Sequence, residues 1–298
     1  MQSTADRPDT PARNRRSRSA RKPNGLPPLL ALLVLLVLIT ESLALGSRTL
    51  SPEEVWQGLL AHDNSVASKV VWELRIHRTV LAVVVGASLA VAGVVMQALT
   101  RNPLAEPGIL GVNAGASLAV VVAIGGFGFI SVNQYLPFAF AGAAAAAVLV
   151  HVMSRRSSDS GPARLVLAGV ALGASLSSIT GTITMYNSKI FDSYRFWVVG
   201  SLENRKLEVL LWVAPFLAVG LVLALASAHS LNALALGDEQ ATALGVNLAV
   251  VRGVAFVALT LLCGAATAAA GPISFIGLVI PHVVRLLVGA DQRRLLAW

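Results

Sequence analysis

The sequence predicts an all-α membrane protein that crosses the bilayer several times. Three observations support this fold class: the composition, the length of the apolar segments and the placement of positive charge. Of the 298 residues, 55% are hydrophobic and only 13% are charged, and the mean hydropathy is +0.72. Soluble domains carry about 25% charged residues, so this composition suits a bilayer better than water.

Apolar segments of the length that a bilayer requires recur along the chain. A helix needs about 20 apolar residues to cross the hydrocarbon core. We therefore expect about eight spans, over residues 26–45, 79–99, 109–130, 135–153, 164–186, 207–228, 248–270 and 273–288.

The N-terminal tail, residues 1–25, is basic and has no apolar period. It holds seven Arg or Lys against two Asp and is rich in Ser and Pro, a composition typical of disorder. Lys and Arg gather on the cytoplasmic side of membrane proteins. We therefore predict a disordered cytoplasmic tail, a transmembrane domain over 26–298, and a multi-pass protein of the cell membrane. We attribute the charge of the tail to this rule and to membrane lipid rather than to nucleic-acid binding.

One basic cluster departs from the rule. The stretch RIHR, Arg75 to Arg78, lies at the outer entrance of the expected span 79–99. Two roles are open for its arginines: they reach lipid headgroups, or they bind carboxylates of a docking partner, which guanidinium groups hold bidentately. A spacing of three places Arg75 and Arg78 on one helix face.

The motifs of catalysis and nucleotide binding are missing from the sequence. There is no HExxH, no GxSxG and no GxxxxGK[ST] loop, and Cys263 is the single cysteine. We therefore expect a protein that is not an enzyme and that binds no metal or cofactor of its own. Gradient-driven carriers usually keep ionisable residues deep in their spans. The expected spans are almost free of them, which favours a separate motor subunit.

The stretch RNPLAEPGILGVNAGAS, residues 101–117, separates two apolar segments. Its prolines cannot continue the preceding helix, and its glycines permit tight backbone geometry. Asn113 can cap the helix that follows. The pattern predicts a compact, rigid re-entry at the inner face, formed by Asn102, Pro103, Pro107, Gly108 and Gly111.

A second broken stretch, LNALALGDEQATALGVN over 231–247, predicts a short helix on the inner side. Asp238 can cap this helix, and an acidic residue in its first turn suits the positive end of the helix dipole. About two turns are too short to be stable alone, so the helix must pack on something. The residues that define it are Gly237, Asp238, Glu239, Ala243, Leu244 and Gly245.

Two further regions hold candidates for pathway or packing roles. In the span 79–99, the small residues Ala82, Gly86 and Ala90 recur on one face, which indicates close helix packing. In GPISFIGLVIPHVVRLLVGADQRRLL, residues 271–296, the glycine–proline pair breaks the chain and the proline–histidine pair is expected to interrupt the last span. The candidates are Gln97, Gly271, Pro272, Pro281 and His282.

Four motifs occur in order along the chain: RIHRTVLAVVVGASLAVAGVVMQALTRNPLAEPGILGVNAGAS, FWVVGSL, LALGDEQATALGVN and GPISFIGLVIPHVVRLLVGADQRRLL. Over residues 30–298 they resemble the FecCD-type permeases. These are the membrane subunits of ABC importers for iron–siderophore complexes, haem and cobalamin.

The resemblance implies a multi-helix importer permease fold with ten spans, of which about eight are expected here. It also implies a homodimer, or a heterodimer with a related permease, a cytosolic ATPase dimer that binds ATP and Mg, and an extracytoplasmic binding protein. It assigns docking of the binding protein to Arg75 and Arg78, and coupling to the ATPase to the short helix defined above. His77 stands where the family has proline, and the family continues with two more spans, so C-terminal truncation is expected.

Two other functions stay open at this stage. One is an ion-coupled secondary carrier, and the other is a truncated scaffold that transports nothing. Co-purification with an ATPase and substrate-stimulated ATP hydrolysis would separate them from an importer permease.

Overall fold

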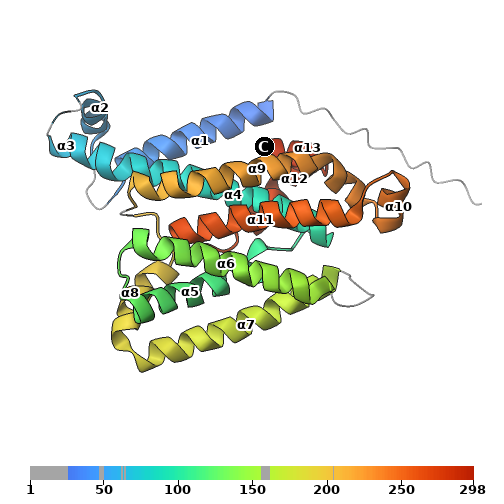
Figure 1. The fold of residues 1–298 in the computed structure, drawn as a ribbon. Coiled ribbons are helices and arrows are strands. Elements are labelled where there is room, and N and C mark those ends of the chain that lie inside the picture. Colours follow the sequence, from blue (N-terminus) through green and yellow to red (C-terminus); the bar gives the residue numbers. More distant parts are fainter. Residues whose placement is uncertain (1–25, 47–49, 62, 64, 156–161, 204) are drawn as a thin grey trace, which may run out of the picture.

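The structure, a computed structural model, describes residues 26–298 apart from 47–49, 62, 64, 156–161 and 204. The predicted disordered tail, 1–25, lies outside the described residues. The described part of the chain is helical (Figure 1). Its elements are α1 (Leu26–Ala44), α2 (Pro52–Ala61), α3 (Val66–Lys69), the π-helical turn η1 (Val70–Arg75), α4 (Ile76–Thr100), the 3-10 turn η2 (Pro107–Leu110), α5 (Val112–Phe127), α6 (Val132–Arg155), α7 (Pro162–Tyr186), α8 (Ser188–Val198), α9 (Leu207–Ala235), α10 (Asp238–Ala243), α11 (Leu248–Ala270), α12 (Ile276–Val288) and α13 (Gln292–Ala297).

Each of the eight predicted apolar segments contains an apolar helix. Within the described residues, five helical stretches are long and apolar enough to cross a membrane, and the apolar helices of α1, α5 and α12 are shorter. The chain is therefore an integral membrane protein. Most boundaries differ from the expected ones by a few residues. The larger differences are that α9 runs on to Ala235, that α5 is only 16 residues long and that the helical stretch ending with α4 begins at Val66.

The helix α11 forms the centre of the bundle and packs against α4, α6 and α9 (Figure 1). Its C-terminal half is built from small residues and is almost completely buried, with Ala265, Ala268 and Ala270 at 0% exposure. Small side chains let helix backbones approach closely in a membrane, which explains this composition at the centre. In contrast, α1 lies along one side of the bundle, and most of its described side chains are exposed.

A close approach between two helices occurs at Gly93, which lies on the same face of α4 as the predicted small residues. A Cβ atom added at Gly86 would meet nothing within 4 Å. A Cβ atom at Gly93 would overlap the carbonyl oxygen of Gly277 and lie 2.6 Å from its carbonyl carbon. The close packing that this face indicated is therefore present, but α12 crosses α4 at Gly93, two turns after Gly86.

The connections contain helices that the apolar pattern did not predict. The helix α8 lies in the expected loop between α7 and α9 and packs against α5 and α7. Its last turn leads to Ser201, whose N–H donates to the carbonyl of Ala270 at 2.8 Å. Gly271 then ends α11 with a φ of 79°, and a Cβ atom there would collide with the carbonyl of Trp197. The predicted break at Gly271-Pro272 is thus confirmed, and it accommodates the end of α8.

Candidate functional site

The short helix predicted on the inner side is present as α10, which projects at one end of the bundle (Figure 1). Its N-cap is Gly237, at a φ of 114°, whereas Asp238 occupies the first helical position. The prediction that Asp238 caps the helix was therefore wrong. At the other end, Gly245 directly follows the C-cap Leu244, adopts a φ of 82° and donates to the carbonyl of Thr242 at 2.9 Å.

The surface of α10 is divided into a buried side and an exposed side. Ala241 is completely buried against the bundle, whereas Glu239 and Ala243 are exposed. Two leucines that flank the helix, Leu236 and Leu244, are 57% and 65% exposed. An exposed apolar pair beside such a short helix is consistent with a surface that a partner covers.

The carboxylate of Asp238 lies between two arginines from different helices. One carboxylate oxygen accepts from Arg101 Nη2, and the other accepts from Arg252 Nη2 at 2.7 Å. Arg101 also donates through Nε to the carbonyl of Leu234, at the end of α9, at 2.9 Å. We call Arg101, Asp238 and Arg252 the α10 clamp.

The electrostatics of the α10 clamp keep Asp238 ionised. Burial opposes ionisation, but hydrogen bonds and charge from Arg252 and then Arg101 outweigh it and lower the pKa of Asp238 below its ordinary 3.8. A lowered folded-state pKa contributes stability that is present above the ordinary value and lost as pH falls through the lowered value. The clamp is therefore complete at neutral pH.

The turn that follows α4 begins at the α10 end and then runs back into the bundle. Asn102 starts the turn, and its side-chain oxygen accepts from the N–H of Leu104 at 2.9 Å. Deeper in the bundle, a Cβ atom on Gly277 would lie 2.8 Å from Pro107 and 3.0 Å from the carbonyl of Leu89. At 1.5 Å per helical residue, Leu89 lies about 16 Å along α4 from its C-terminal end, so the nearby Pro107 lies well inside the bundle. The turn therefore begins at the α10 end with Asn102 and Pro103 and re-enters the bundle with Pro107, Gly108 and Gly111, whereas its place at the inner face stays a prediction.

The glycines of this turn allow a left-handed backbone at Gly111 and a close side-chain contact at Gly108. Gly111 adopts a φ of 74° and is the N-cap of α5, so the predicted cap by Asn113 was wrong. Asn113 instead lies inside α5 and accepts from the hydroxyl of Thr267 at 3.0 Å. A Cβ atom at Gly108 would lie 3.1 Å from the side-chain amide nitrogen of Asn113, Nδ2, which explains why a glycine suits this position.

Sequence reasoning did not find the role of Glu106. One of its carboxylate oxygens accepts from the N–H of Phe275 at 2.8 Å, and Phe275 is the N-cap of α12 with a φ of 70°. Glu106 thus supplies an acceptor and a negative charge to the first turn of α12. The signal in the sequence was an acidic residue between two prolines, but nothing in it pointed to a partner so far along the chain.

We expect Glu106→Ala to lower the thermal unfolding temperature in detergent, because the first turn of α12 loses an acceptor. Loss of a helix cap costs about 1 kcal/mol. Glu106→Gln keeps an oxygen at the same place and serves as the matched control. If both variants unfold like the original chain, the contact with Phe275 contributes nothing to stability.

Among the remaining candidates for pathway or packing roles, Gln97 holds α12 in place. Gln97 is 3% exposed, accepts from Arg285 Nη2 at 2.9 Å and donates to the carbonyl of Leu278 at 3.4 Å. Both partners belong to α12, so Gln97 joins α4 to that helix. Pro281 is buried and His282 is exposed within a continuous α12, so the predicted interruption of this span was wrong. Proline is tolerated inside membrane helices where neighbouring groups satisfy the freed carbonyl.

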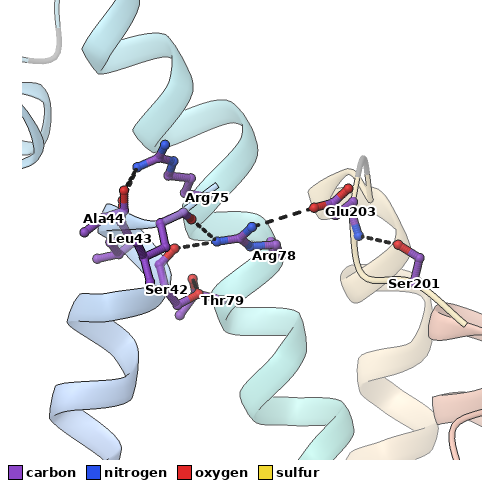
Figure 2. Close-up of polar contacts among 9 residues, drawn as sticks. Ser42, Leu43, Ala44, Arg75, Arg78, Thr79, Ser201 and Glu203 are labelled. Atoms are coloured by element: carbon purple, nitrogen blue, oxygen red, sulfur yellow. Dashed lines mark hydrogen bonds and ion pairs between the residues drawn. The ribbon is translucent and has the colours of Figure 1, made fainter. Parts of the chain in front are cut away.

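At the opposite end of the bundle, Arg75 and Arg78 bind the C-terminal end of α1 (Figure 2). The last carbonyl groups of a helix have no partner within it. Arg75 Nη1 donates to the carbonyls of Leu43 and Ala44 at 2.5 and 2.8 Å, and Arg78 Nη2 donates to those of Ser42 and Leu45 at 2.5 and 2.8 Å. The two side chains therefore act together, as their spacing predicted, and they cap a helix.

The two arginines differ in their access to a partner. Arg75 is 4% exposed, so its guanidinium group is enclosed. The side chain of Arg78 is 23% exposed, and its Nη1 lies 3.9 Å from Glu203, a carboxylate that is 70% exposed (Figure 2). Docking of a binding protein on these arginines stays a prediction, and it depends mainly on Arg78.

Among the described residues, no three His, Cys, Asp or Glu side chains lie close enough to hold a metal ion. The apolar helices, the exposed short helix at one end and the arginine-capped helix at the other define a polytopic membrane permease. The chain belongs to the FecCD transport family, which it matches over residues 32–298.

Several relatives share most of this chain. It is 44% identical over 254 residues to the ferric enterobactin transport system permease protein FepD of Escherichia coli, a match that covers 85% of this chain and 76% of that protein. It is 41% identical to the vitamin B12 import system permease protein BtuC of Yersinia enterocolitica, covering 84% and 74%. A solved ABC transporter in an inward-facing conformation superposes with a TM-score of 0.77 at 31% identity, covering 91% of this chain and 84% of that one.

Proposed function

We propose that this chain is the permease subunit of an ABC importer for an iron–siderophore, haem or cobalamin-like complex. ATP and Mg²⁺ bind to a separate ATPase subunit. The observation that carries the proposal is membership in the FecCD family, together with similarity to permeases named for ferric enterobactin, ferric citrate and vitamin B12. The helix α10, with exposed leucines beside it, supports a contact with a cytosolic partner.

This function fixes an orientation for the bundle. The α10 end faces the cytoplasm and the ATPase dimer, and the N-terminus lies on the same side of the cell membrane. The end that carries α2 and α3 faces an extracytoplasmic binding protein. A carboxylate of that protein reaches Arg78 by taking the place of Glu203. Two such permeases, identical or related, form the pathway between them.

We expect Leu244→Asp to abolish both co-purification of the ATPase in detergent and uptake in proteoliposomes. Leu244 is 65% exposed beside α10 and becomes buried when an ATPase covers it. A carboxylate buried there without a partner costs several kcal/mol. Leu60→Asp is the matched control for ATPase co-purification, because Leu60 is 67% exposed on α2 at the end away from the ATPase. Uptake is not compared in this variant, since that end faces the binding protein.

The same experiment separates the alternative functions. Full association and uptake in Leu244→Asp would reject the ATPase contact at α10. Uptake by the original chain that follows an ion gradient without an ATPase would favour a secondary carrier. A chain that binds partners but transports nothing would favour a scaffold.

A further inference from the structure

The α10 clamp joins the short helix to three longer helices. Arg101 directly follows α4, Arg252 belongs to α11, and the Nε of Arg101 is bonded to the carbonyl of Leu234 near the end of α9. We infer that Asp238 is a positioning residue that transmits movement of α10 to α4 and α11, an inference that rests on the proposed function. Without the clamp, α10 would still bind the ATPase, but its movement would no longer be transmitted to α4 and α11.

The backbone at Arg101 supports this role independently. Arg101 adopts a φ of 50°, and it closes α4 with bonds from its own N–H to Ala98 and from the N–H of Asn102 to Gln97. Glycine is the usual residue at this position of a helix end, because other side chains are strained in the left-handed region. The strain is maintained at a residue whose side chain reaches both Asp238 and α9.

The geometry of the clamp also explains why movement would be transmitted in a fixed direction. The two arginines bind different oxygens of one carboxylate, so Asp238 is held from two sides rather than on one flexible pair. Charge-assisted bonds of this kind are shorter and more directional than neutral ones. The arginine on α11 connects the clamp to the helix at the centre of the bundle, and Arg101 connects it to α4 and to the turn that contains Glu106.

The test compares Asp238→Asn with Glu239→Gln in the complete transporter. Both changes remove one negative charge from the first turn of α10, but no hydrogen bond or ion pair is formed by the Glu239 side chain in the described structure. Arg252→Gln breaks the same clamp from α11 and leaves the surface of α10 unchanged, so we expect it to retain ATPase association and basal ATP hydrolysis and otherwise to behave like Asp238→Asn. In both variants, stimulation of hydrolysis by the loaded binding protein should fall by about 5- to 150-fold, the usual range of coupling between sites. Glu239→Gln should retain stimulation, and Asp238→Glu should restore part of it.

A second measurement reports on the clamp without the ATPase. Spin labels at Leu104 and Ala243, both exposed, measure the distance between α10 and the turn after α4. Asp238→Asn should broaden this distance distribution, and Glu239→Gln should leave it narrow. Equal stimulation in Asp238→Asn and Glu239→Gln, or loss of ATPase association in Arg252→Gln, would overturn the inference. Failure of the original chain to bind any ATPase would reject the proposed function instead, and an unbroadened distribution would reject the clamp.

Discussion

Gly93→Ala is expected to prevent α4 and α12 from packing and to give a chain that expresses poorly and unfolds at low temperature in detergent. The added Cβ atom would overlap the carbonyl oxygen of Gly277 and lie 2.6 and 2.7 Å from its carbon and Cα. These atoms are all backbone, so no rotamer change can relieve the clash. Overpacking of a well-packed interior costs about 1–3 kcal/mol, and rigid neighbours raise that cost.

Gly86→Ala is the matched control for this prediction. It makes the same change two turns earlier on the same helix, at a place where the new atom meets nothing within 4 Å. Alanine also has the higher helix propensity. We therefore expect Gly86→Ala to fold normally, measured as monodisperse protein after size exclusion and as the thermal midpoint. Equal midpoints for the two variants would show that α12 does not approach α4 as closely as described.

Arg75→Glu is expected to release the C-terminal end of α1 from the bundle. The change removes two charged donors from the carbonyls of Leu43 and Ala44 and places a carboxylate at the negative end of the helix dipole. Hydrogen bonds to charged groups contribute about 1.5–3 kcal/mol each. Cross-linking between cysteines introduced on α1 and α4 should fall sharply, with or without a binding protein present.

The control for Arg75 is Glu203→Gln, at the exposed end of the same network. Glu203 is 70% exposed and lies 3.9 Å from Arg78, so its loss should leave cross-linking unchanged. Arg78→Gln tests docking separately, since it keeps donors for α1 but removes the charge that a binding protein would meet. If Arg75→Glu leaves α1 in place and weakens only the binding protein, Arg75 is a docking residue after all.

The sequence predicted the apolar helices because a helix that crosses the bilayer needs about 20 apolar residues, and such segments are visible in the sequence. It also predicted α10, since Gly237 and Gly245 flank a polar run on an apolar background. It misplaced the role of Asp238 because an aspartate before a short helix usually caps it, and the competing partners, Arg101 and Arg252, are brought close only by the packing of α4 and α11.

The arginines at the other end show the same limit. Arg75 and Arg78 depart from the rule that Lys and Arg gather on the cytoplasmic side, and this departure correctly indicated that they have a specific role. The groups that accept their hydrogen bonds are carbonyls at the end of α1, more than 30 residues earlier in the chain. No local sequence pattern reveals these partners. Only the position of Gly277 distinguishes Gly93 from Gly86, and no local pattern reveals that position.

The contact between Glu106 and Phe275 has a consequence for biosynthesis. The two residues are 169 positions apart, so the ribosome delivers Glu106 and the short helix α5 long before α12 exists. At 16 residues, α5 is shorter than the roughly 20 that a span needs, so it cannot settle in the bilayer as an autonomous span. The turn before α5 therefore completes its contact with Phe275 only after α12 has been made. A chain interrupted before that point leaves the Glu106 carboxylate without this partner.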